Sequence, residues 1–215
     1  VRAYATNAGG TAYGAEVDFR TDKPPVVTTT AAGGIMPRQA TCGGTVTEDG
    51  GETVTDRGVC WGASANPTVA GDHVHIGSGV GVFSGTLQIL TPETHYHARA
   101  YAINSLGTSY GADVTFDTTA LTAPILTTSV ISANIPRSAV CGGAVSSDGG
   151  ETLSGHGVCW STSTLPTIAG DHTHDGSNVG VFISILPALT PGATYHVRAW
   201  AENSIGLTYG NEVDF

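Results

Sequence analysis

The amino-acid sequence repeats itself about every 98 residues. Val1–Phe19 reads VRAYATNAGGTAYGAEVDF, and closely similar segments return at Ala98–Phe116 and Val197–Phe215. A period of this length indicates tandem copies of one small domain. It also argues against a single active site, because a catalytic centre does not need to be copied in each period.

The composition is that of a folded β protein. Apolar residues make up 40% of the chain and charged residues 12%, which excludes a disordered polymer. The 30 glycines and 10 prolines separate short runs of Val, Ile, Thr, Tyr and Phe, and no long amphipathic helical pattern occurs. This arrangement predicts many short strands joined by tight turns.

The period predicts three parts. Residues 1–22 are expected to form the last two strands of an incomplete preceding repeat, and residues 23–119 and 120–215 one β-sandwich each. A two-stranded hairpin is marginal in water, so we expect the chain to be a window of a longer array. The alternative is that the hairpin adds to a sheet edge of an identical subunit.

Charge limits the partners. The net charge is −10 and Lys23 is the single lysine, which disfavours nucleic acids and anionic membranes. No apolar run approaches the roughly 18 residues that a transmembrane helix requires, and the sequence shows no signal peptide. Neighbouring repeats or identical subunits are the expected partners, with a glycan as a further candidate.

The cysteines form two copies of one pair. Cys42 and Cys60 are 18 residues apart, as are Cys141 and Cys159, and the second pair follows the first by 99 residues. One disulfide inside each unit is the simplest connectivity, and it implies an oxidising compartment. The alternative is a pair of buried free thiols in each unit.

Two segments carry a resemblance to a known family. LTPETHYHARAYAIN from Leu90 and LTPGATYHVRAWAEN from Leu189 place a tyrosine shortly after Leu-x-Pro. With TCGGTVTEDGGETVTDRGVCWGASANPT (Thr41–Thr68) and its echo at Val140–Thr167, they resemble fibronectin type III-like repeats of secreted and surface proteins of Bacteroidetes-type bacteria.

The resemblance implies tandem seven-stranded fibronectin type III/Ig-like β-sandwiches in which the tyrosine hydroxyl bonds to the backbone before strand F. In strand F, Tyr96, Ala98, Ala100 and Ala102 are expected to face the core. The family transfers no catalytic residues, and its modules act mostly as spacers, stalks or adhesive units outside the cell.

Two loops carry an Asp-His-x-His motif that could bind zinc or copper, because an extended His-x-His places both imidazoles on one face. The competing interpretation is that these are solvated histidines in inherited loops. The candidate ligands are Asp72, His73 and His75 in the first unit and Asp171, His172 and His174 in the second.

A row of basic and aromatic residues is the candidate ligand face. If Cys60 points inward, Trp61 points outward beside strand F, and the row could stack sugars. The structural alternatives are an Arg–Trp cation–π ladder or packing between repeats, and a reversed assignment with Trp61 in the core would remove the platform. The face comprises Trp61, Arg99, Tyr101, Trp160, Arg198 and Trp200.

Catalysis has no support in the sequence. No G-x-S-x-G, H-E-x-x-H or P-loop is present, and acidic residues such as Asp113 are interpreted as solubilising. The sequence therefore predicts a non-enzymatic extracellular structural module, namely a stalk, spacer, filament or adhesin segment. A carbohydrate-binding module is the main rival. No cofactor is expected apart from a divalent metal at the histidine loops.

Overall fold

A computed structural model describes residues 1–215 and contains strands but no helix. The predicted all-β fold is therefore confirmed. The chain divides into two compact units, the first containing Val1–Ile35 and Gln39–Thr118 and the second Met36–Arg38 and Thr119–Phe215. None of its elements is a helix with the length and apolarity needed to cross a membrane.

The first residues form a hairpin of β1 (Arg2–Asn7) and β2 (Gly10–Glu16), which pair antiparallel as a sheet of their own. Every residue of the two strands is exposed. Arg2 lies across the hairpin, where its Nε donates to the Gly14 carbonyl at 3.2 Å and its guanidinium carbon lies 5.2 Å from the centre of the Tyr13 ring.

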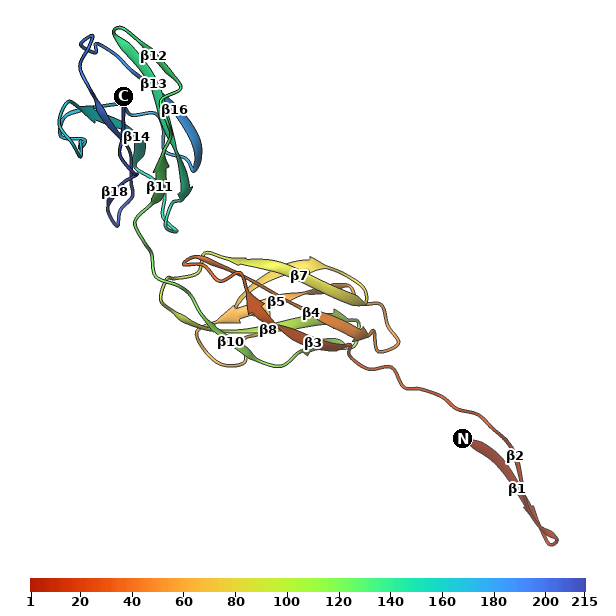
Figure 1. Ribbon diagram of the computed structural model, residues 1–215. Helices are drawn as coiled ribbons and strands as arrows, with labels where there is room; N and C mark the ends of the chain where they lie inside the picture. Colours follow the sequence, from red (N-terminus) through yellow and green to blue (C-terminus); the bar gives the residue numbers. More distant parts are fainter. The chain divides into compact units, whose positions relative to one another are not determined.

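The rest of the first unit is a two-layer sandwich (Figure 1). One sheet has the order β3-β4-β7, and the other has the order β10-β8-β5-β6 with β9 also paired to β8. The strands are β3 (Val26–Gly33), β4 (Gln39–Glu48), β5 (Asp56–Gly62), β6 (Asp72–Gly77), β7 (Gly81–Gln88), β8 (His95–Asn104), β9 (Gly107–Tyr110) and β10 (Val114–Asp117).

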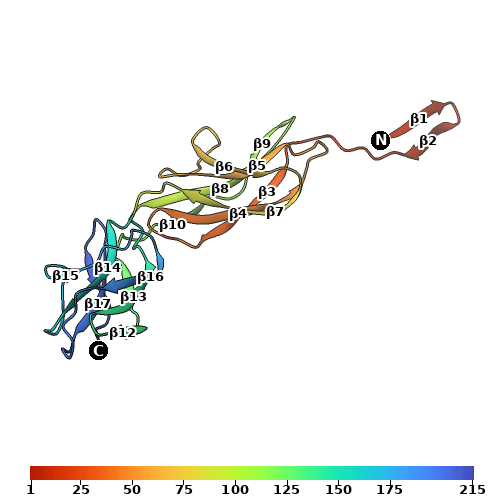
Figure 2. The same cartoon turned by 90° about the horizontal axis from the view of Figure 1, so that it is seen from above.

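The second unit repeats this arrangement (Figure 2). One sheet has β13 paired to β11 and β12 on one side and to β16 on the other, and the second has the order β15-β14-β17-β18 with β19 also on β17. The strands are β11 (Ile125–Thr128), β12 (Ala133–Ile135), β13 (Ser138–Ser147), β14 (Gly155–Ser161), β15 (Asp171–His172), β16 (Gly180–Leu186), β17 (His196–Glu202), β18 (Leu207–Tyr209) and β19 (Val213–Asp214).

Some strand positions are interrupted, so the elements outnumber the seven uninterrupted strands expected for each unit. The last strand of each unit is broken into two pieces that pair with the same neighbour, β9 and β10 on β8 and β18 and β19 on β17. In the second unit the first strand is also broken, because β11 and β12 both pair with β13.

The core lies between the two sheets and follows the alternation of strand β8. Ala98, Ala100 and Ala102 are fully buried in it, and Tyr96 packs against them. The predicted inward face of this strand is confirmed. Small side chains on β8 let the facing sheet approach closely, and larger residues such as Phe83 and Leu87 of β7 fill the remaining space.

The predicted tyrosine corner is present in both units. The backbone N–H of Thr91 donates to the Tyr96 hydroxyl at 3.0 Å, and that of Thr190 donates to the Tyr195 hydroxyl at 3.0 Å. Each tyrosine thereby fixes the turn that leads into β8 or β17 and sets the direction in which the following residues point.

Candidate functional site

Strand β5 faces the opposite way from the sequence-based expectation. Val59 and Trp61 pack into the core, whereas Cys60 lies outside the core cluster. The reason is that Val59 and Trp61 together carry more apolar surface than Cys60, and strict alternation allows only one of these two sets to face inward. Trp160 is likewise part of the second core and is 7% exposed.

The predicted disulfides are wrong, because all four cysteines are free and buried. Cys42 belongs to the core, where its thiol donates to the Thr30 carbonyl at 3.3 Å. Cys60 lies on the other side of its sheet and donates to the Pro67 carbonyl at 3.2 Å. Cys141 and Cys159 repeat this arrangement, donating to Ser129 and Pro166. The argument for an oxidising compartment falls with the bridges.

We expect these thiols to be unreactive in the folded protein. Burial raises the pKa of Cys60 and of Cys159 to about 11, and it also raises the pKa of Cys42 and of Cys141, so little thiolate forms near neutral pH. Ellman's reagent should label none of them in buffer and all four in denaturant. A disulfide-linked peptide found by mass spectrometry of the non-reduced chain would contradict this expectation.

The predicted aromatic platform is wrong, because its rings are covered. Tyr101 is fully buried, and its ring lies over Gly58 of the neighbouring strand β5. The edge strand β6 covers it further, since the His73 ring meets it edge-on at 6.2 Å. Its hydroxyl donates to Asp56 at 3.2 Å, and burial, followed by that carboxylate, raises the pKa of Tyr101.

Trp200 occupies the same position in the second unit and is only 4% exposed. It lies opposite Gly157 of β14, and its indole N–H donates to the Thr173 carbonyl at 3.1 Å. The rings of His172 and His174 meet it at 6.1 and 5.7 Å. No face of this indole remains free for stacking against a sugar.

The arginines of the row act within the sheet. The guanidinium carbon of Arg99 lies 4.6 Å from the centre of the Tyr110 ring, and its Nε donates to the Gly111 carbonyl at 3.0 Å. Arg198 makes the same two contacts in the second unit. Its guanidinium carbon lies 4.5 Å from the centre of the Tyr209 ring, and its Nε donates to the Gly210 carbonyl at 3.2 Å. The arginines thus make cation–π contacts, but their partners are tyrosines of the last strand and not the tryptophans expected for an Arg–Trp ladder.

The Asp-His-x-His loops do not form metal centres. His73 and His172 each hydrogen-bond through Nδ1 to the carbonyl two residues earlier, at 2.9 Å, and His75 Nδ1 lies 2.5 Å from Asp56. No group of three or more His, Cys, Asp or Glu side chains in the chain is placed to hold a metal ion. The structure therefore lends the metal hypothesis for these loops no support.

An acidic clamp was missed at the sequence level. Asp113, interpreted there as solubilising, has a side chain that is only 20% exposed. One of its oxygens accepts the Asn66 backbone N–H at 2.8 Å and lies 3.0 Å from His97 Nδ1. The carboxylate thus ties the loop after β5 to strand β8 and to the segment between β9 and β10.

The second unit has the same clamp. Glu212 accepts the Leu165 backbone N–H and lies 3.1 Å from His196 Nδ1. The residues that receive the clamp, Asn66 and Leu165, have φ angles of 57° and 53°, which non-glycine residues adopt only at a cost. His97 and Asp113 have counterparts in His196 and Glu212, each 99 residues later in the chain. This recurrence was the sequence signal for the contact.

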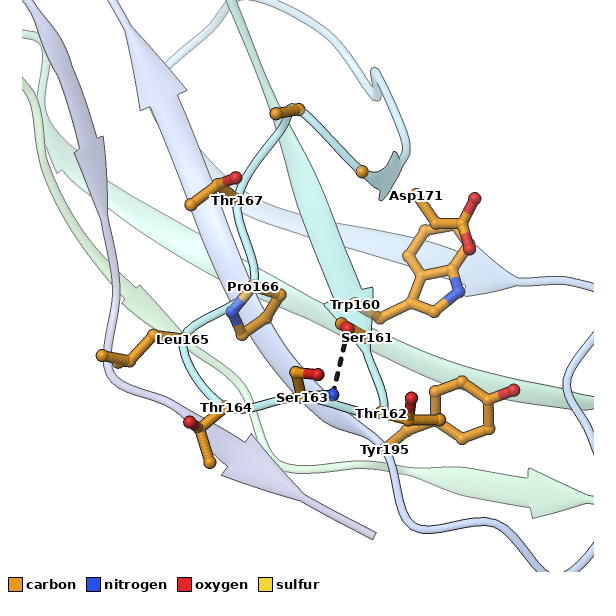
Figure 3. A pocket seen from close by; sticks show the side chains of 12 residues that line it. Trp160, Ser161, Thr162, Ser163, Thr164, Leu165, Pro166, Thr167, Asp171 and Tyr195 are labelled. Atoms are coloured by element: carbon orange, nitrogen blue, oxygen red, sulfur yellow. Dashed lines mark hydrogen bonds between the residues drawn. The ribbon is translucent and has the colours of Figure 1, made fainter.

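The clamped loop of the second unit borders a hollow of about 810 Å³ (Figure 3). Its wall is rich in hydroxyl groups, and Trp160 and Tyr195 contribute aromatic rings. Asp171, the register partner of Trp160, is the only charged residue of the lining. The lining residues are Trp160, Ser161, Thr162, Ser163, Thr164, Leu165, Pro166, Thr167, Ala169, Gly170, Asp171 and Tyr195.

This hollow offers hydrogen-bonding groups but no activated nucleophile. Its lining contains no histidine or cysteine that could take a proton from a serine or threonine hydroxyl. The first unit has a smaller hollow of about 390 Å³ beside the equivalent pair, Trp61 and Asp72. Unlike the hollow of the second unit, this one includes a histidine, His73, whose Nδ1 is hydrogen-bonded to the Gly71 carbonyl.

One strand position, partly buried in the first unit and buried in the second, differs in kind between the units. Arg57 of β5 donates to the carbonyls of Gly79, Val80 and Gly81 at 3.0–3.2 Å and lies 5.2 Å over the Phe83 ring. The equivalent residue, His156, is 1% exposed and lies 4.4 Å from Phe182, and neither of its ring nitrogens makes a hydrogen bond.

We expect His156 to make the second unit sensitive to acid. Burial lowers its pKa below the ordinary value of 6.5, against the opposing effects of Asn178 and Asp175, and His174 adds to the lowering. The folded state then binds fewer protons than the unfolded state, so the stability is complete above about pH 6.5 and falls below it.

The measurement is urea unfolding at several pH values. A single proton limits the slope to about 1.4 kcal/mol per pH unit. Trp61 reports on the first unit and Trp160 and Trp200 report on the second, and a His156→Leu variant should remove part of the pH dependence from the second unit only. An equal pH dependence in wild type and variant would show that His156 does not titrate between the two states.

Comparison with known proteins identifies no family for this chain. No family model and no curated protein matches the chain. Among solved structures, the sensor domain of the anti-sigma factor RsgI4 of Pseudobacteroides cellulosolvens is similar, with 21% identity and a TM-score of 0.36, covering 47% of this chain and 100% of its own.

The FN1–FN3 domains of chicken CNTN1 are also similar, with 14% identity and a TM-score of 0.34, over 99% of this chain and 75% of theirs. Both similarities are weak, and no function of this chain follows from either.

Proposed function

We propose that this chain is a non-enzymatic structural module of a repeat protein outside the cell, serving as a stalk, a spacer or a segment of a surface filament. The proposal rests on the contacts that the recurring residues make. A side chain kept in every repeat for ligand binding should be exposed, whereas one kept for architecture should be engaged within its own unit.

The recurring residues here are engaged internally. Arg2, Arg99 and Arg198 each donate through Nε to a glycine carbonyl in or directly after the paired strand and stack on the tyrosine of that strand, at 5.2, 4.6 and 4.5 Å. The side-chain amide of the buried Asn104 donates to the carbonyls of Lys23 and Asp49 in the first unit. In the same way, that of the buried Asn203 donates to the carbonyls of Thr122 and Asp148 in the second unit.

The extracellular setting rests on the resemblance to secreted and surface repeats, because the free thiols give it no support. Antibodies raised against the chain should label intact cells of the organism that produces it, while a cytoplasmic marker stays unlabelled. Detection in the lysate alone would contradict the proposed location.

The absence of a ligand is tested separately on a glycan array. We expect no binding above background, because the aromatic residues proposed for sugar stacking are covered. Reproducible binding to one glycan class would replace the structural role by a recognition role, even if the surface location held.

A further inference from the structure

The outer face of β16 carries a row of exposed aliphatic side chains. Val181, Ile183 and Ile185 alternate along the strand and are 79%, 71% and 64% exposed. The alternate residues Phe182 and Leu186 face the core, and Ser184 is buried with them. Alternation of this kind normally places polar residues on the solvated face of an antiparallel sheet, so the aliphatic row has no explanation in the fold of the unit itself.

The row lies beside a low strip on the neighbouring strand β13. The register places Val140 opposite Ile185, Gly142 opposite Ile183 and Ala144 opposite Val181. A ridge of branched side chains therefore stands next to a strip of smaller ones. We call these six residues the aliphatic face.

The first unit shows that the architecture does not require this face. At the equivalent register positions Thr86 pairs with Thr41, Ser84 with Gly43, and Val82 with Thr45. Hydroxyl-bearing side chains thus fill most of the positions that are aliphatic 99 residues later. The difference is specific to the second unit.

We propose that the aliphatic face docks against the same face of a second copy of this chain. Charge at the face itself does not oppose this occupant. The chain carries a net charge of −10, so two copies repel each other wherever their acidic groups meet, and the aliphatic face contains no charged residue. It is a surface across which like-charged copies can approach without pairing or burying charges.

Shape favours the same occupant. A two-fold axis that runs parallel to the strands, above the line between β13 and β16, places the ridge of each copy over the strip of the other, which is the isologous contact that a symmetric dimer requires. Two such faces would stack as sheets do in a sandwich, with their side chains interdigitated.

The interaction is expected to be weak between free chains. The three ridge residues expose on the order of 400 Å² of apolar surface, about half of what one partner contributes to a standard stable interface. Because the contact adds association to the proposed structural role without depending on it, either inference can fail alone.

Sedimentation velocity on the full chain tests the proposal. Between about 10 µM and about 1 mM we expect the sedimentation coefficient to rise toward that of a dimer. Added salt should strengthen the association, because it screens the repulsion between acidic copies and does not weaken apolar contacts. Monomer throughout this range, or dissociation by salt, would overturn it.

Two lysine substitutions supply a matched pair. Ile183→Lys should abolish the association and Ser84→Lys, at the equivalent position of the first unit, should leave it unchanged, although both alter the net charge equally. An association that survives Ile183→Lys, or that Ser84→Lys removes to the same extent, contradicts the proposed face. If Ile183→Lys lowers the unfolding midpoint, Ile183→Thr replaces it, because threonine keeps the branched strand-forming shape.

Cross-linking tests the geometry. Since the four native thiols are buried, Ile183→Cys adds the one accessible thiol, and a short bis-maleimide cross-linker, which spans a wider gap than a disulfide, should give covalent dimers. Ser84→Cys should give none beyond random collision. Equal yields from the two variants would reject the two-fold arrangement.

Discussion

Replacing Gly58 by alanine is expected to unfold the first sandwich unit or to destabilise it by at least about 3 kcal/mol. A Cβ atom at this position would lie 1.9 Å from the Val74 carbonyl oxygen and 2.8 Å from both Cε1 and the hydroxyl of Tyr101. The tyrosine is fully buried and cannot swing away, and the carbonyl belongs to the backbone of the paired strand β6. Relief therefore requires separation of β5 from β6.

Gly62→Ala is the matched control, because it lies at the end of the same strand and its Cβ would meet nothing within 4 Å. Its effect should stay within about 0.5 kcal/mol. Urea unfolding followed by Trp61 fluorescence measures both variants. Similar stabilities for the two would show that the covering of Tyr101 by β6 is not maintained in solution.

Much of the fold was accessible from the sequence because local pattern and packing agree there. On β8 the small alanines alternate with bulky polar residues, so only one orientation buries a continuous apolar face. The tyrosine corner was equally accessible, since Leu-x-Pro and tyrosine at a fixed distance define one turn with one hydrogen bond.

Strand β5 was assigned the wrong way round because both of its faces are buried. Gly58, Val59 and Cys60 are all inaccessible to solvent, so alternation of hydrophobicity cannot tell inside from outside. Gly58 was the available signal, because a glycine opposite an aromatic residue makes room for the ring. Reading it correctly places Tyr101 over β5, Cys60 on the outer side and Trp61 in the core.

The candidate site could not be assembled from sequence motifs because its contacts are made across the chain. His73 and His75 are neighbours in sequence, yet their rings go to a local carbonyl and to Asp56. Asp113 binds a backbone N–H 47 residues away, which no local spacing reveals. A motif shows which side chains are present, whereas the sheet register decides which of them meet.

Replacing Trp160 by alanine is expected to destabilise the second unit by about 3–5 kcal/mol. The side chain is 7% exposed and packs in a core with Phe182 and Leu186, so its removal leaves a large cavity that rigid strands cannot close. Trp200 fluorescence during urea unfolding measures the effect, and the transition reported by Trp61 should stay where it is in the wild type.

Leu165→Ala is the control within the same hollow, because Leu165 is 64% exposed and its contact with the clamp uses only its backbone N–H. We expect a change within about 0.5 kcal/mol. A tryptophan serving as a sugar platform would give the reverse result, with little loss of stability at Trp160 and loss of ligand binding instead. The two substitutions therefore decide whether this indole belongs to the architecture of the repeat or to a recognition surface.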